Sequence, residues 1–96
     1  MADSLRWTRE GGRLSLQGEL DQDFLVPLWE AREEATQGVD TIDLTAITRV
    51  DTAGVALLMH LVAHIHQQGR TVKIEGKSEK MNTLVQLYNL TPDLIP

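Results

Sequence analysis

The chain has no cysteine, which excludes disulfide bonds, thiolate metal sites and cysteine nucleophiles. It also has no long hydrophobic run: the longest, Val55 to Met59, is far shorter than the roughly 20 apolar residues that span a bilayer. The N-terminal residues lack the basic flank and the apolar stretch of a signal peptide, so none is expected. These absences indicate a soluble chain of a reducing, cytosolic compartment.

Basic residues are sparse, and no block of Lys or Arg occurs. The chain has 9 Lys and Arg against 14 Asp and Glu, for a formal net charge of −5. Nucleic-acid binding depends on a basic stripe that neutralises phosphates, so we expect no nucleic-acid partner. Direct membrane insertion, or adhesion to an anionic membrane surface, is not expected either. The expected partners are therefore other proteins.

With 96 residues, 42% of them hydrophobic, the chain has room for one core, and we assign residues 1–96 to a single domain. Hydrophobic periodicity predicts the element order β-β-α-β-α-β-α. The predicted elements are two hairpin strands on either side of Glu10-Gly11-Gly12, a helix that ends at residue 37 and begins anywhere from Asp23 to just before Pro27, a strand over 39–47, a helix over 55–68, a strand over 71–74 and a last helix capped by Ser78. Strands separated by helices indicate an α/β fold, with a mixed sheet of about four strands and helices packed against it.

The helix over 55–68 has the clearest apolar face. Apolar residues that recur at steps of three and four predict a central core helix: Val55, Leu58, Leu61, Val62 and Ile65. In the last helix, Tyr88 shares a face with Met81 and Leu84, so we expect it in the core. Trp7, on the first strand, is expected there too. Arg32 and its acidic neighbours are expected to form a solvated helix face.

The segment Arg49-Val50-Asp51-Thr52-Ala53-Gly54-Val55 joins the third strand to the central helix through a short polar turn. The first backbone N–H groups of a helix lack intrahelical partners, so a hydroxyl, carboxylate or phosphate is stabilised beside them. Asp51 and Thr52 are both residue types that cap helices. The turn is therefore either a plain helix cap or a functional site, and its composition alone leaves both open.

This turn, set between Ile42-Asp43-Leu44 and Val55-Ala56-Leu57-Leu58, resembles the Asp-Ser/Thr-x-Gly turn of STAS domains, the family named for sulfate transporters and anti-sigma factor antagonists. The resemblance covers nearly the whole chain and implies a STAS-like fold. In the antagonist branch the hydroxyl residue after the Asp is phosphorylated, so the resemblance makes Thr52 a candidate phosphorylation site. Here Thr replaces the commoner Ser, and its β-branched side chain is stiffer.

Three further segments, Gly18-Glu19-Leu20-Asp21, Leu28-Trp29-Glu30 and Leu87-Tyr88-Asn89-Leu90, resemble the branch of the family that provides small subunits of ABC phospholipid transporters. That resemblance implies a cytoplasmic subunit, held at the inner membrane of a Gram-negative bacterium by the transporter. Its implied partner is the ATPase subunit and, through it, the membrane permease and a lipid-binding subunit. The implied role is to stabilise or activate the ATPase of a transporter that keeps the outer membrane asymmetric.

The expected docking contact is centred on Thr52, because a hydroxyl both donates and accepts hydrogen bonds. The small Ala53 and the glycine at Gly54 would let a partner's backbone approach closely. Outward positions of the following helix are expected to line the same surface. Trp29 departs from the apolar stripe of its own helix, which favours a place at the partner surface or beside it. The expected partner-binding residues are Asp51, Thr52, Ala53, Gly54, Trp29, His60 and His64.

A metal site, an enzyme active site and a kinase-switched regulator are the rival interpretations. His60 and His64 stand four residues apart with His66 nearby, but no glutamate lies between them and no cysteine is available. Thr52 has no glycine-rich loop with lysine to form a phosphate cradle, so no catalytic set emerges. We therefore expect no metal, no cofactor and no enzyme activity. The main alternative is a phosphorylation-switched regulator of the anti-sigma antagonist type, which would meet a serine/threonine kinase at the same turn. A further alternative, ranked lower because of the matches outside the turn, is a STAS module from another transport or sensory complex.

Overall fold

Four strands form one mixed sheet in the computed structural model, which describes residues 4–96. The elements are β1 (Arg6–Glu10), β2 (Arg13–Leu20), α1 (Val26–Glu30), α2 (Arg32–Ala35), β3 (Thr41–Val50), α3 (Thr52–Gln67), β4 (Lys73–Glu75) and α4 (Glu79–Leu87). In the sheet order β1-β2-β3-β4, β1 runs antiparallel to β2, and the other two pairs are parallel. The predicted α/β fold is confirmed; the start of the predicted domain, residues 1–3, lies outside the described residues.

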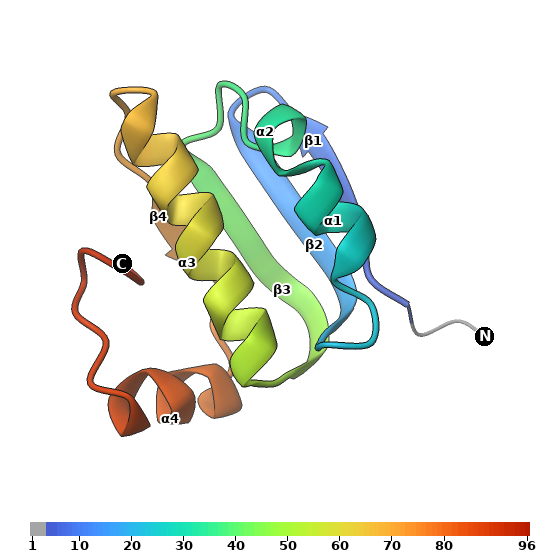
Figure 1. The fold of residues 1–96 in the computed structure, drawn as a ribbon, viewed down its shortest axis with the longest axis vertical. Coiled ribbons are helices and arrows are strands. Elements are labelled where there is room, and N and C mark those ends of the chain that lie inside the picture. Colours follow the sequence, from blue (N-terminus) through green and yellow to red (C-terminus); the bar gives the residue numbers. More distant parts are fainter. Residues whose placement is uncertain (1–3) are drawn as a thin grey trace.

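Helices α1, α2 and α3 cover the same face of the sheet (Figure 1). The predicted apolar face of α3 is buried against it throughout: Val55, Leu58, Leu61, Val62 and Ile65. From the sheet, Leu14, Leu16 and Ile42 are fully buried beneath the helices. Because burying a large apolar side chain contributes about 1.5 to 3 kcal/mol, this packing holds α3, and with it the turn at residue 51, firmly on the sheet.

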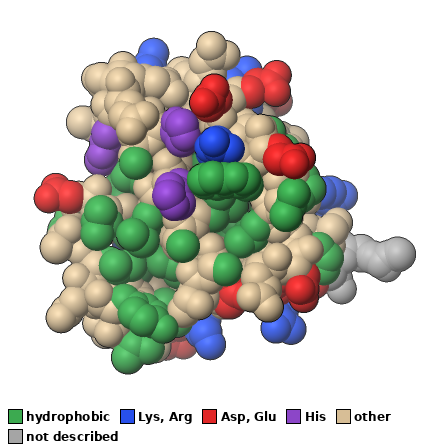
Figure 2. All heavy atoms as spheres, viewed as in Figure 1, with side chains coloured by type: hydrophobic (Ala, Val, Ile, Leu, Met, Phe, Trp, Pro, Cys, Tyr) green, Lys and Arg blue, Asp and Glu red, His purple; other side chains and the backbone are tan. Residues whose placement is uncertain are grey.

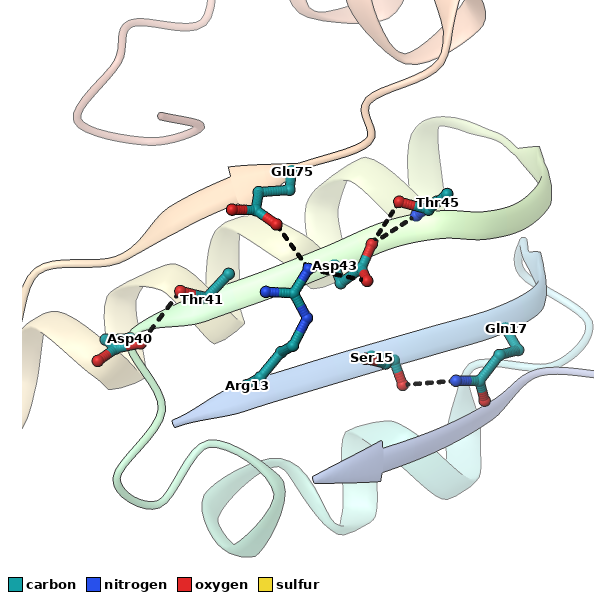
Figure 3. Close-up of polar contacts among 8 residues, drawn as sticks. All are labelled: Arg13, Ser15, Gln17, Asp40, Thr41, Asp43, Thr45 and Glu75. Atoms are coloured by element: carbon teal, nitrogen blue, oxygen red, sulfur yellow. Dashed lines mark hydrogen bonds and ion pairs between the residues drawn. The ribbon is translucent and has the colours of Figure 1, made fainter. Parts of the chain in front are cut away.

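The opposite face of the sheet is polar, as the alternation of side chains along a strand requires (Figure 3). Arg13 of β2 forms ion pairs with Glu75 of β4 at 2.6 Å and with Asp43 of β3 at 3.1 Å. Asp43 also accepts hydrogen bonds from the hydroxyl and the backbone N–H of Thr45, at 2.6 and 2.9 Å. These bonds from Thr45, with a smaller contribution from Arg13, hold the pKa of the Asp43 carboxyl below its usual value.

The expectation of a single helix up to residue 37 is wrong, although the observed start at Val26 falls within the expected range from Asp23 to just before Pro27. The structure has two short helices, α1 and α2, separated at Ala31, where φ is −95° and ψ is 10°. Pro27 lies in the first turn of α1, which is where a missing N–H costs least. The residues around Ala31 are good helix formers, so propensity does not explain the break. Propensity is a weak prior that tertiary packing overrides.

Strand boundaries also differ from the expected ones. β3 extends to Val50 and pairs with β2 up to Leu20, whereas the sequence favoured an end at residue 47. β4 pairs only with residues Thr41 to Asp43, so most positions of β3 beyond them are exposed. The second half of β3 therefore mixes polar residues with apolar ones, which hid it from a prediction based on hydrophobicity. β4 itself begins at Lys73 and not at residue 71. As a result β3 runs directly into α3, with only Asp51 between them.

Tyr88 is not in the core, which corrects our expectation from the last helix. Its side chain is 55% exposed, because α4 ends at Leu87 and the chain turns away at Asn89, whose φ is 54°. Asparagine is one of the few residues that adopt this left-handed conformation readily, and it commonly ends helices. Trp7 packs against the core but is only half-buried.

Candidate functional site

Asp51 caps the N-terminus of α3. Its carboxylate accepts a hydrogen bond from the backbone N–H of Gly54 at 2.9 Å, and its own backbone is extended, as in most N-cap residues. The second carboxylate oxygen accepts from the backbone N–H of Gln22 at 3.2 Å. Asp51 therefore ties the start of α3 to the loop that follows β2.

Gly54 is buried where α3 meets the end of β2. A Cβ atom at this position would lie 2.0 Å from the carbonyl oxygen of Leu20, so no side chain fits there. The backbone that comes closest to Gly54 is thus the chain's own, which corrects our reason for placing this glycine in the partner contact. The glycine lets the first turn of α3 sit against the sheet and so sets the orientation of that turn.

Thr52 is the first residue of α3 and is exposed. Because the Asp51 carboxylate supplies the cap, the Thr52 hydroxyl is not used for capping. It takes part in none of the side-chain hydrogen bonds found among residues 4–96. Ala53, the next residue, is half-buried. The first turn of α3 therefore places at the surface a hydroxyl group, that of Thr52, which is available to donate and to accept a hydrogen bond.

An open groove of about 530 Å³ begins at Thr52. We call it the Thr52 groove; it is lined by Thr52, Val55, Ala56 and Met59 of α3 and by Tyr88 and Leu90, which follow α4. Apart from the two hydroxyl groups, the lining side chains are apolar. An apolar groove with a polar group at one end suits the apolar side chains of another protein.

Trp29 lies at the end of α1 and reaches α3 through His60. The two rings meet edge to face, with centroids 5.1 Å apart and an interplanar angle of 78°. The guanidinium carbon of Arg32 lies 3.9 Å from the centroid of the Trp29 ring, a cation–π contact. Trp29 remains 38% exposed, so one side of this Trp29 cluster, defined as Trp29, Arg32 and His60, is open.

Hydrophobic side chains gather over α3 and α4 on the face shown in Figure 2, with histidines beside them. Exposed positions of α3 recur at steps of four, from Thr52 through Ala56 to His60, and join the Thr52 groove to the Trp29 cluster. His64 lies one turn further and is half-buried. An exposed apolar patch of this kind is typical of a protein interaction site.

Neither a metal site nor a membrane span is found in the described part of the chain. Within residues 4–96, no three His, Asp or Glu side chains come together in a way that could hold a metal ion, and His66 is exposed. None of the helices described there is both long enough and apolar enough to cross a bilayer.

Sequence reasoning does not name six residues of these surfaces: Arg32, Val55, Ala56, Met59, Tyr88 and Leu90. It places Arg32 on a solvated face, although Arg32 lies three residues after Trp29, a spacing at which helical side chains meet. Tyr88 and Leu90 were not recognised as groove residues, because Tyr88 was placed in the core and Leu90 was given no surface role. Asn89 between them was the signal for the helix end that exposes Tyr88.

Comparison with known proteins identifies the family. Residues 4–96 match the model of the STAS domain of MlaB type. The chain is 51% identical over 96 residues to the intermembrane phospholipid transport system binding protein MlaB of Escherichia coli (strain K12), and equally to its namesake in Shigella flexneri; each alignment covers 100% of this chain and 99% of the relative. Among solved structures, the anti-sigma factor antagonist SpoIIAA in its unphosphorylated form shares the fold, with a TM-score of 0.65, 16% identity, and coverage of 88% of this chain and 83% of that one. The chain thus belongs to the MlaB-type STAS domain family.

Proposed function

We propose that this chain is the accessory subunit of an intermembrane phospholipid transport system and acts by docking on the system's ATPase subunit. The 51% identity to MlaB over the full chain supports membership of such a system. The ATPase would be of MlaF type, and through it the chain would be linked to a permease of MlaE type and a lipid-binding subunit of MlaD type. These assignments rest on the family resemblance.

The free hydroxyl of Thr52 is the observation that carries this proposal. A residue that served only to cap α3 would have its hydroxyl bonded to the helix, whereas here Asp51 makes that bond. An exposed hydroxyl at a helix start beside an apolar groove is suited to a protein interface, where it bonds to a partner group while apolar side chains fill the groove.

The docking surface we propose comprises the Thr52 groove and the Trp29 cluster, with Ala53 and His64 at its margin. Asp51 and Gly54 support it from beneath, by capping α3 and by letting it approach Leu20. Large aromatic side chains that are partly exposed, such as Trp29 and Tyr88, commonly carry much of the binding energy at interfaces. The surface thus combines a polar contact at one end with aromatic anchors.

In this function the chain hydrolyses nothing. It stabilises or activates the ATPase by binding it, and it contributes to maintaining the lipid asymmetry of the outer membrane only through the transporter. It would lie on the cytoplasmic face of the inner membrane and be held there by its partner. The alternative, a regulator switched by phosphorylation of Thr52, uses the same exposed hydroxyl, because a phosphate adds about −1.5 to −2 charges at that point.

Partner identity separates the two functions. Tagged chain is recovered from detergent-solubilised membranes and cytosol of its source organism, and proteins that co-purify are identified by mass spectrometry. Wild-type chain is compared with Thr52→Glu and with Thr71→Glu, which introduces the same charge at an exposed position beyond the C-terminal end of α3. An ABC ATPase with its permease, lost only in Thr52→Glu, is the expected result. Recovery of a kinase or a sigma-regulatory protein instead would contradict it.

A further inference from the structure

The Trp29 side chain is held by contacts that its own helix does not supply. α1 has five residues and ends at Glu30, so Trp29 lies in its last turn, next to the break at Ala31. In a helix this short, Trp29 has no neighbour one turn further along in α1, and the residue at that spacing, Arg32, belongs to α2. Yet the ring has a defined place against His60 of α3.

Arg32 supplies the missing support through two contacts with the same residue. Its guanidinium donates a hydrogen bond from Nη1 to the backbone carbonyl of Trp29 at 2.8 Å, and its guanidinium carbon lies 3.9 Å from the centroid of the Trp29 ring. The planar guanidinium group can stack on a ring and donate from its edge at the same time. Arg32 thus restrains both the backbone and the ring of Trp29.

Arg32 has acidic neighbours in the sequence, but its side chain contacts Trp29 instead. Glu33 and Glu34 follow it directly, but none of the ion pairs found among residues 4–96 includes Arg32. Exposed ion pairs contribute little, and a cation over an indole ring contributes at least as much. Arg32 is half-buried, whereas Glu33 and Glu34 beside it are exposed.

We propose that Arg32 is a positioning residue of the docking surface, which fixes the Trp29 ring against His60 in the orientation that the partner meets. This inference rests on the proposed function and adds a residue to it. A side chain already ordered before binding loses less conformational freedom in the complex, so fixing Trp29 strengthens binding without a direct contact from Arg32. Loss of this fixation is expected to weaken binding about three- to tenfold.

The free chain tests the positioning itself. With 5-fluorotryptophan in place of its two tryptophans, the chain gives one fluorine resonance for Trp7 and one for Trp29. In Arg32→Ala the Trp29 resonance should narrow and move towards the position found in unfolded chain, while the Trp7 resonance stays in place. Arg32→Lys keeps the charge but loses the planar group, so its Trp29 resonance should lie between those of wild type and Arg32→Ala. The control Arg70→Ala removes the same charge from an exposed residue after α3 and should change neither resonance.

The affinity for the ATPase subunit tests the consequence. Arg32→Ala should weaken binding, and the double variant Trp29→Ala/Arg32→Ala should bind no more weakly than Trp29→Ala alone. An unchanged Trp29 resonance in Arg32→Ala would overturn the positioning role. So would a double variant whose loss of affinity equals the sum of the losses in the two single variants. If wild-type chain does not bind the ATPase at all, the proposed function fails and the docking role of Arg32 fails with it; the fluorine spectrum of the free chain distinguishes this outcome from a failure of positioning.

Discussion

Asp51 accepts a hydrogen bond from the backbone N–H of Gly54 at 2.9 Å, and this bond decides what the neighbouring threonine can do. With the cap of α3 supplied by the carboxylate, the Thr52 hydroxyl stays at the surface without a partner of its own among residues 4–96. The sequence alone left two interpretations of the turn, a plain cap and a functional site. The structure assigns the cap to Asp51 and leaves the Thr52 hydroxyl exposed.

Removing the Asp51 cap should reduce stability. Asp51→Ala loses the bond to Gly54 and also the bond to the backbone of Gln22, so we expect the free energy of unfolding to fall by about 1 to 2 kcal/mol. Urea unfolding followed by circular dichroism measures this. Asp93→Ala removes the same charge from an exposed residue and is the control. An equal effect in both variants would show that Asp51 has no special role.

Gly54 should tolerate no side chain. A Cβ atom would lie 2.0 Å from the carbonyl oxygen of Leu20, which is backbone and cannot move aside without shifting β2. Gly54→Ala is therefore expected to cost about 1 to 3 kcal/mol of stability, or more. In Gly12→Ala the nearest atoms belong to the Asp40 side chain, which can rotate away, so the loss there should be small. Equal melting temperatures for the two variants would contradict this packing.

Thr52 variants should separate binding from stability. Thr52→Ser keeps the hydroxyl and should largely preserve the affinity for the ATPase subunit. Thr52→Ala removes a hydrogen bond that becomes buried in the complex, at a cost of about 1 to 3 kcal/mol, or about 5- to 150-fold in affinity. Because Thr52 is exposed and does not cap α3, neither change should lower the melting temperature appreciably. Calorimetric titration gives the affinities; a large loss of folding stability in Thr52→Ala would mean that the residue has a structural role after all.

The Asp43 carboxyl should contribute to stability above about pH 4. Hydrogen bonds from Thr45 keep its pKa in the folded chain below the ordinary value of 3.8, so folding favours the ionised form. That contribution is complete above the ordinary pKa and is lost as the pH falls through the lower pKa of the folded chain. Thr45→Val should therefore be less stable than wild type at about pH 6, and the difference should shrink towards about pH 2. Urea unfolding at both pH values checks this, with Thr71→Val as the exposed control; a difference that is the same at both values would contradict it.

Periodicity predicted the parts of the fold in which burial repeats regularly. The apolar face of α3 and the alternating strand β2 follow from spacing alone, because each buries one side of a regular element. The break at Ala31 could not be predicted, since the residues around it favour a helix and none of them is a residue type that ends one. The polar half of β3 was missed for a related reason, because no strand pairs with it on the side of β4.

The candidate site was predictable where it is continuous in sequence. The turn from Asp51 to Gly54 could be selected from its residue types, although the division of roles within it depends on distances that no pattern gives. The Thr52 groove could not be predicted, since Tyr88 reaches it only because α4 ends at Leu87. The contact between Trp29 and His60 joins residues from two helices, and it too depends on the tertiary arrangement.

The most direct test of the account is the affinity of purified chain for the purified ATPase subunit, measured for wild type and for Thr52→Glu in parallel with their unfolding curves. Charge and bulk at Thr52 would fall within the proposed contact, so Thr52→Glu should bind no ATPase while remaining as well folded as wild type. A folded Thr52→Glu variant that binds the ATPase as tightly as wild type would contradict the claim that the partner docks at this turn.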